Sequence, residues 1–142
     1  MKKITLIILL LFSTITFSQM WDTKERKYSD GVAAVGLIDV KNYKVSDLKA
    51  AGKDVTLLYD PYFQKYTIDW IDEKDKTNRM SLVFKENDRG RKIYIDQYSP
   101  TGDAYLITDE ISSAKKVTVI SATTNNVNGK QYKLIIIFDD LK

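Results

Sequence analysis

A two-residue alternation of apolar and polar side chains dominates the sequence from Asp54 onward. In residues 55–59 and 66–70, large apolar or aromatic residues occupy every second position. Successive side chains of a β-strand point to opposite faces of the sheet, so this period is typical of strands with one buried face. The alternation therefore predicts a β-rich domain.

Turn-forming residues separate the alternating segments. Asp60-Pro61 predicts a turn with proline in its second position, Asn128-Gly129 is a strong hairpin signal, and Gly36 is expected to weaken or bulge the first strand. We expect about seven or eight strands in an antiparallel meander that forms a small barrel, a sandwich or a curved sheet. The expected strands are residues 31–40, 55–59, 66–71, 80–85, 91–98, 104–111, 116–123 and 130–138.

One short helix is predicted near residues 46–51. Ser46 is a typical N-cap residue, and Gly52 stands where glycine commonly ends a helix. Helical segments do not alternate with the expected strands, which argues against a parallel sheet built from βαβ units. The expected fold class is therefore mainly β with one helix.

Residues 1–18 have the features of a cleavable secretory signal peptide. Two lysines precede an apolar run over residues 4–12, and the small residues Thr16 and Ser18 suit the positions just before a signal-peptidase cut. The apolar run is shorter than the roughly 20 residues of a membrane span, and an uncleaved anchor is the alternative. We therefore expect an exported protein, periplasmic or secreted, with one β-rich domain over residues 19–142 that does not span a membrane.

Histidine and cysteine are both absent from the sequence. Their absence excludes His-based acid–base catalysis, Ser-His-Asp triads, His-ligated zinc, cysteine nucleophiles and thiolate metal sites. It also excludes disulfides and a thioether lipid anchor, so stability has to come from apolar burial and sheet hydrogen bonds. We expect neither a cofactor nor a metal, and a binding protein rather than an enzyme.

The charge balance argues against a nucleic-acid partner. The chain has 22 basic and 19 acidic residues, and these counts become 20 and 19 without the two lysines of the expected signal peptide. Proteins that bind nucleic acids usually carry a strong basic patch, because they neutralise phosphates. A nearly neutral mature domain lacks this electrostatic signature.

Tyrosine is unusually frequent, with nine in the chain. Tyr62 and Phe63 fall at a turn, where exposed aromatic residues are typical anchors of binding surfaces, although they can instead fold back over an open barrel end. Tyr94 and Tyr98 should share a strand face that Tyr105 extends on the next strand. The predicted ligand- or partner-binding residues are Tyr59, Tyr62, Phe63, Tyr66, Tyr94, Tyr98 and Tyr105.

Three functions are consistent with these patterns. The first is an exported binding module whose ligand is a protein, a glycan or a small apolar molecule. The second is a small hydrolase that uses Tyr and Lys or paired carboxylates, for which the acidic pairs are Asp69 with Asp72, Asp109 with Glu110 and Asp139 with Asp140. The third is a protective protein that neutralises a toxin or an enzyme in the same compartment.

The barrel interior distinguishes these functions. Inward-pointing Tyr94, Tyr98 and Tyr105 around a cavity would indicate a ligand carrier. A filled core with Tyr62 and Phe63 exposed would indicate contact with another protein.

Overall fold

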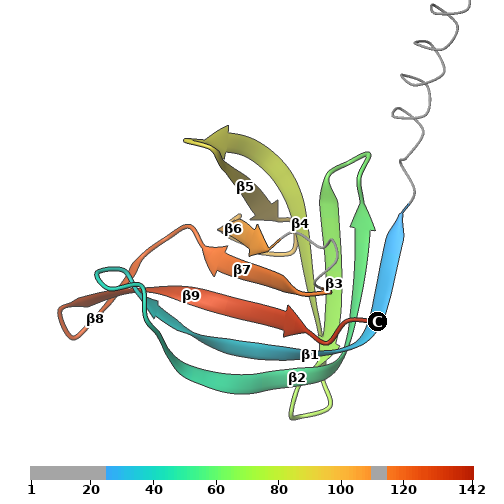
Figure 1. The fold of residues 1–142 in the computed structure, drawn as a ribbon, viewed down its shortest axis with the longest axis horizontal. Coiled ribbons are helices and arrows are strands. Elements are labelled where there is room, and N and C mark those ends of the chain that lie inside the picture. The colour runs from blue at the N-terminus through green and yellow to red at the C-terminus, as the bar shows by residue number, and fades with distance from the viewer. Residues whose placement is uncertain (1–24, 110–114) are drawn as a thin grey trace, which may run out of the picture.

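The computed structural model describes residues 25–109 and 115–142, which form nine β-strands (Figure 1). Strands β1 to β7 and β9 close an antiparallel barrel in up-and-down order, because β9 pairs with both β7 and β1. The expected mainly-β meander is confirmed, with the barrel as its architecture. The predicted signal peptide lies outside the described residues. The strands are β1 (Arg26–Asp39), β2 (Val45–Asp60), β3 (Lys65–Ile71), β4 (Thr77–Asp88), β5 (Arg91–Asp96), β6 (Ala104–Asp109), β7 (Val117–Ser121), β8 (Asn125–Val127) and β9 (Lys130–Asp139).

The helix predicted at residues 46–51 is wrong, because this segment is part of β2. Lys49 pairs with Val35 of β1, and Ala50 pairs with Ala34. A helix of so few residues has little stability of its own in water, whereas pairing with β1 satisfies the backbone over a long ladder. Tertiary pairing therefore overrides the local helix signals.

Gly52, the expected helix end, has a packing role instead. A Cβ atom there would lie 2.5 Å from the carbonyl oxygen of Ile71 and 2.6 Å from Cδ1 of Trp70. Contacts this short cannot be accommodated without moving the backbone of β3. Glycine therefore lets β2 approach β3 closely.

Replacing Gly52 with alanine is expected to lower the free energy of unfolding by about 1–3 kcal/mol, because the added methyl group overpacks the β2–β3 contact. Urea titration of the variant and the wild type measures this loss. Ser46→Ala, in the exposed half of the same strand, is the control and should change stability by less than about 0.5 kcal/mol. A Gly52→Ala protein as stable as the wild type would show that the strands do not approach so closely.

Side chains fill the interior of the barrel. Tyr66, Leu57, Ile68, Leu82 and Phe138 each expose 1% or less of their surface. Alternate residues of most strands point inward, as the two-residue alternation predicts, and they form one apolar cluster. The main hollows among the described residues are open depressions of the surface, lined by turns, by strand ends and, between β2 and β4, by the middle of strands. The barrel is therefore held together by a packed core.

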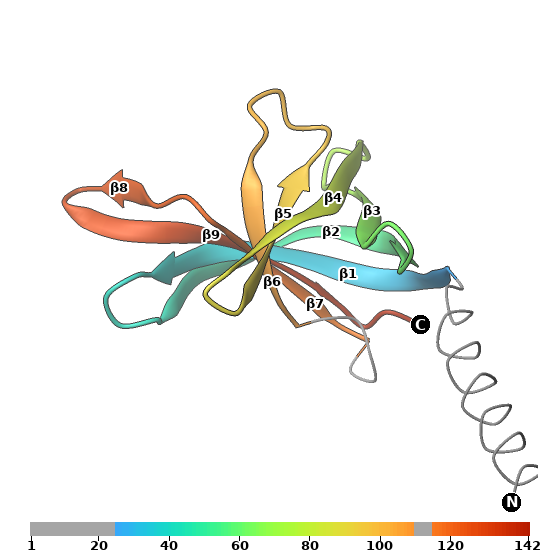
Figure 2. The same ribbon diagram turned by 90° about the horizontal axis from the view of Figure 1, so that it is seen from above.

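Two hairpins extend beyond the barrel body on the same side (Figure 2). The turn between β1 and β2 meets the β8–β9 hairpin, where the N–H of Val40 donates to the carbonyl of Gln131 at 3.0 Å. The hairpin predicted at Asn128-Gly129 is confirmed, with positive φ angles of 51° and 77°. The irregularity expected at Gly36 is also confirmed, as a register shift in the β1–β2 ladder.

Candidate functional site

Tyr62 and Phe63 form the most exposed pair of adjacent aromatic side chains on the described barrel, and we call this pair the aromatic tip. It lies on the turn between β2 and β3, at the upper end of the barrel in Figure 1. Tyr62 is 72% exposed and Phe63 is 65% exposed. Their rings meet edge to face, with centroids 4.8 Å apart and planes at 85°. The tip is therefore an apolar knob in solvent and does not fold back over the barrel end.

The turn beneath the tip is held by hydrogen bonds. The carboxylate of Asp60 accepts the backbone N–H of Tyr62 at 2.9 Å and that of Phe63 at 3.2 Å. The N–H of Phe84 on β4 donates to the carbonyl of Gln64 at 3.0 Å and ties the turn to the neighbouring strand. A preorganised turn loses little conformational entropy when it binds a partner.

Aromatic side chains continue from the turn into the core. Tyr59 stacks on Tyr66 with ring centroids 4.6 Å apart, and Tyr66 meets Tyr94 at 5.7 Å. Phe84 meets Tyr94 at 5.9 Å. Tyr59 is partly buried, whereas Tyr66 and Tyr94 are buried in the core. These tyrosines anchor the hairpin, and only the aromatic tip above them is open to solvent.

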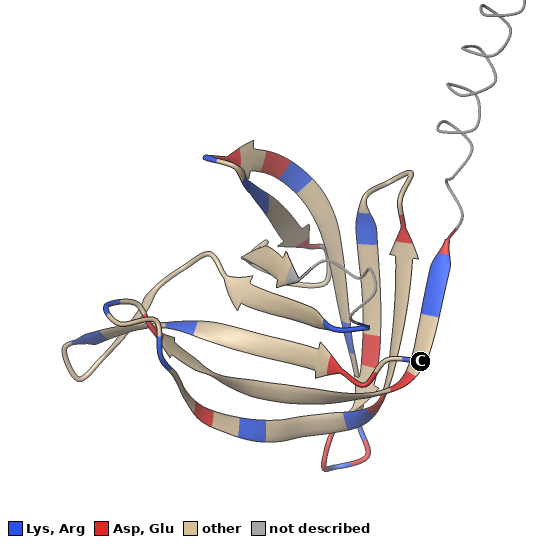
Figure 3. Cartoon of the chain, viewed as in Figure 1, with Lys and Arg blue, Asp and Glu red and all other residues tan. Residues whose placement is uncertain are grey.

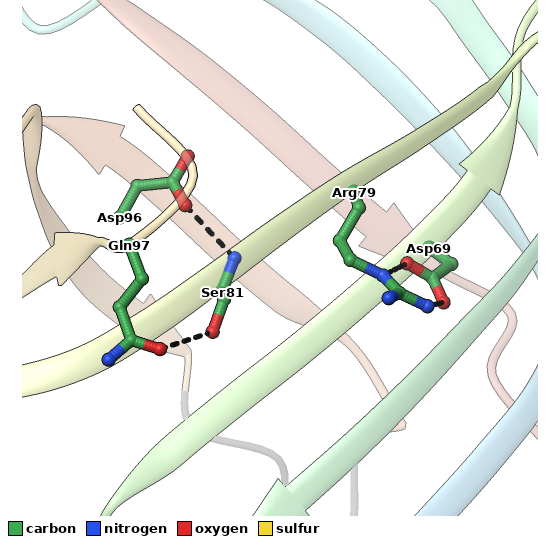
Figure 4. Close-up of polar contacts among 5 residues, drawn as sticks. All are labelled: Asp69, Arg79, Ser81, Asp96 and Gln97. Carbon is green, nitrogen blue, oxygen red and sulfur yellow. Dashed lines mark hydrogen bonds and ion pairs between the residues drawn. The ribbon is translucent and has the colours of Figure 1, made fainter. Parts of the chain in front are cut away.

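The expected face of Tyr94, Tyr98 and Tyr105 does not form as one patch. Tyr94 pairs with Tyr105, and both are buried inside the barrel. Tyr98 is 59% exposed, because β5 ends at Asp96 and the chain turns there. The buried carboxylate of Asp96 accepts the N–H of Ser81 at 3.0 Å, which Figure 4 shows, and that of Tyr98 at 3.1 Å. The carboxylate thus fixes the turn that places Tyr98 outside.

The pKa of Tyr105 provides a pH test of the filled interior. Burial raises the pKa of its phenol above the usual value of 10.0, and the charges of Asp103 and Asp96 raise it further. Tyr105 of the unfolded chain ionises at lower pH than that of the folded chain, so stability should fall as the pH rises above about 10.

Tyr105→Phe is expected to show a smaller loss of stability than the wild type between about pH 8 and about pH 11, measured by urea unfolding. The exposed Tyr43→Phe variant is the control and should lose as much stability as the wild type. An equal loss in wild type and Tyr105→Phe would contradict a buried, neutral Tyr105.

Outside the barrel, Tyr98 lies next to an ion pair of β3 and β4. Arg79 donates from Nε to one carboxylate oxygen of Asp69 at 2.6 Å and from a terminal nitrogen to the other at 2.8 Å (Figure 4). The hydrogen bond with Asp69 raises the pKa of Arg79 above its usual value, and a hydrogen bond with Tyr98 has a smaller effect in the same direction. The surroundings of Tyr98 are therefore polar, unlike those of the aromatic tip.

Three of the acidic residues considered from the sequence, Asp69, Asp72 and Asp139, accept hydrogen bonds from nearby groups. Asp69 binds Arg79, whereas the carboxylate of Asp72 accepts the side-chain amide of Asn78 and the N–H groups of Lys74 and Lys76. These hydrogen bonds, of which that from Asn78 has the largest effect, lower the pKa of Asp72.

The remaining acidic residues show no arrangement for catalysis or metal binding in the described part of the chain. The carboxylate of Asp139 accepts the backbone N–H of Asp140. Glu110 lies outside the described residues. Within residues 25–109 and 115–142, no group of three or more acidic side chains is arranged to hold a metal ion.

Some exposed apolar residues were not singled out from the sequence. Tyr43 is 78% exposed in the β1–β2 turn, and Leu48 is 51% exposed on β2. The exposure of Leu48 could not be predicted, because the sequence around it has the features of a short helix rather than of a strand. For Tyr43, the only available sign was its place in the otherwise polar segment of residues 41–44, which predicts a solvent-exposed turn.

Comparison of the chain with protein-family models, with curated proteins and with solved structures finds no significant match. In the part of the chain that the structure describes, no helix is long and apolar enough to cross a membrane. The functional inference therefore rests on the geometry of the barrel and of the aromatic tip.

Proposed function

We propose that this protein is a non-enzymatic binding module that recognises another protein through the aromatic tip. The observation that carries the proposal is that Tyr62 and Phe63 are mostly exposed although the turn below them is rigidly held. Exposing two large rings to water is unfavourable, and such rings become anchors when a partner buries them. Their fixed orientation reduces the entropic cost of that step.

The geometry favours a protein partner over a sugar or a small apolar ligand. A sugar ring or flat ligand stacks best on one broad aromatic face, whereas the rings of the tip are nearly perpendicular. A small apolar ligand needs an enclosed space, and tyrosines and aliphatic side chains occupy the barrel interior. A pocket on a protein surface can surround both the edge and the face of such a knob.

We place this binding function outside the cytoplasm, in the cell envelope or the medium. Support comes from the signal-like sequence of residues 1–18. Exposed aromatic anchors and the absence of catalytic His and Cys agree with a module that binds rather than transforms its partner.

Affinity capture tests the proposal. The mature protein, the Tyr62→Ser/Phe63→Ser double variant and a Tyr43→Ser control are each immobilised and exposed to envelope extract and culture medium of the producing cells. The expected result is a protein retained by the wild type and by the control but lost with the double variant. Tyr43 is a matched control because it is equally exposed and lies at the other end of β2. If all three proteins retain the same set, recognition does not use the tip.

A further inference from the structure

A second surface lies at the start of β2, the opposite end of that strand from the aromatic tip. The β1–β2 turn and the β8–β9 hairpin lie side by side there, because the N–H of Val40 donates to the carbonyl of Gln131. Both extend beyond the barrel body on the same side (Figure 2). We call this surface, residues 39–49 and 125–133, the hairpin end.

Lysines dominate the charge of the hairpin end. This surface has five lysines and two aspartates, whereas the other described residues have 14 basic and 15 acidic side chains. Figure 3 shows blue segments on both hairpins. Within residues 25–109 and 115–142, none of the five takes part in an ion pair. A nearly neutral barrel therefore has one positive end, whose charges are open to an external anion. The lysines are Lys41, Lys44, Lys49, Lys130 and Lys133.

Exposed apolar side chains lie among these lysines. Tyr43 is 78% exposed, more than any other large apolar or aromatic residue of the described chain. Leu48, Val127 and Val45 are each about half exposed. The hairpin end therefore offers water both positive charge and apolar surface.

Hydrogen bonds fix the turn that carries Tyr43. The carboxylate of Asp39 accepts the N–H of Lys41 at 2.8 Å, and its carbonyl accepts the N–H of Tyr43 at 2.8 Å. The side-chain oxygen of Asn42 accepts the N–H of Lys44 at 3.0 Å. The ring of Tyr43 is thus held in solvent with a lysine on either side of it in the turn.

We propose that the hairpin end binds a lipid surface with anionic headgroups. The lysines complement the negative headgroups, and each lysine near such a surface strengthens binding roughly fivefold. A tyrosine suits the boundary between headgroups and acyl chains, because its ring is apolar and its hydroxyl is polar. A soluble polyanion could neutralise the lysines but would leave Tyr43, Val45 and Leu48 in water. An anionic lipid surface accommodates both the charges and the apolar side chains, so it is the occupant that fits.

Lipid binding at this end leaves the aromatic tip free. Tyr43 precedes β2, whereas Tyr62 and Phe63 follow it. A chain that rests on lipid through the hairpin end can therefore hold a protein partner at its other end.

Vesicle co-sedimentation tests the proposal with the chain lacking residues 1–18, whose apolar run would itself enter lipid. Vesicles of phosphatidylcholine with about 30% phosphatidylglycerol should bind the protein, whereas pure phosphatidylcholine should bind it weakly. Raising the salt from about 0.05 M to about 0.5 M should weaken binding to the anionic vesicles, because salt screens the lysines. Circular dichroism melts establish that each variant used below remains folded.

Charge reversal locates the surface. K41E/K44E is expected to lower the affinity for anionic vesicles at least about 20-fold, since two lysines are lost and two repulsive charges are added. K74E/K76E makes the same charge change at exposed lysines of the β3–β4 turn and should lower affinity by less than about threefold. Tyr43→Ser/Val45→Ser keeps all charges and should lower affinity at least about threefold, because apolar surface is removed.

Several outcomes would overturn lipid binding by the hairpin end. Equal binding to both kinds of vesicle, no binding to either, or equal losses in the two charge reversals would each contradict it. If dextran sulfate binds as tightly as anionic vesicles and Tyr43→Ser/Val45→Ser has no effect, the lysines recognise polyanions rather than lipid. Loss of vesicle binding in Tyr62→Ser/Phe63→Ser would assign the lipid contact to the aromatic tip. K41E/K44E should still retain the captured protein, so lipid binding and partner capture can fail independently.

Discussion

Replacing both rings of the aromatic tip, as Tyr62→Ser/Phe63→Ser, is expected to lower affinity for the captured partner by about 100- to 1,000-fold. Each anchor residue of an interface typically contributes about 2 kcal/mol or more when truncated, and about 1.4 kcal/mol corresponds to tenfold in affinity. Both rings are more than half exposed in the free protein, so their burial is available to drive binding. Isothermal titration calorimetry with the purified partner measures the loss. Single replacements should each produce an intermediate loss.

The stability of the double variant decides how that loss is interpreted. Because both side chains are exposed, their replacement should change the free energy of unfolding by less than about 0.5 kcal/mol each. Tyr43→Ser is expected to bind the partner as the wild type does. Affinity of the double variant within threefold of the wild type would contradict a role of the tip in recognition.

Truncation of Phe138 is expected to cause the largest loss of stability of any single change considered. Phe138 is fully buried, and its ring centroid lies 5.4 Å from that of Trp70 across the interior. It also pairs with Ala33 on β1 and Val117 on β7, so it sits where β9 closes the barrel. Phe138→Ala should lower the free energy of unfolding by about 3–5 kcal/mol, a large part of the 5–15 kcal/mol typical of domains.

Urea unfolding of Phe138→Ala measures this loss. Phe138→Leu keeps most of the volume and should lose much less, whereas Phe63→Ala removes an equally large ring from the surface and should lose little. A loss below about 1 kcal/mol for Phe138→Ala would show that the interior is loosely packed. Such a result would reopen the possibility of a ligand inside the barrel.

Much of the fold follows from local sequence patterns. The alternation in residues 55–59 and 66–70 places the buried side of β2 and β3 correctly, and Asn128-Gly129 marks its hairpin because both residues adopt positive φ readily. The closure of the barrel could not be predicted, since the pairing of β1 with β9 joins the two ends of the chain. Pairing over such distances leaves no local signal, and it also turned the expected helix into strand.

The candidate site was only partly predictable for the same reason. The turn at Asp60-Pro61 placed Tyr62 and Phe63 at a hairpin tip but left open whether they fold back over the barrel end, and the structure places both in solvent. The separation of Tyr98 from Tyr94 depends on the buried carboxylate of Asp96, which accepts a hydrogen bond from Ser81 on another strand. The sequence gives no sign of that contact, so it could not show that β5 ends early.

Site-specific photo-crosslinking is the most direct test of recognition through the aromatic tip. A benzophenone amino acid is introduced at Phe63, or at Tyr43 as the control, and the protein is irradiated in the cells that produce it. The expected result is one protein adduct from position 63 that is absent from position 43. Excess wild-type protein should compete for that adduct, whereas the Tyr62→Ser/Phe63→Ser variant should not. Equal adducts from both positions, or none from position 63, would contradict binding of a protein partner at the tip.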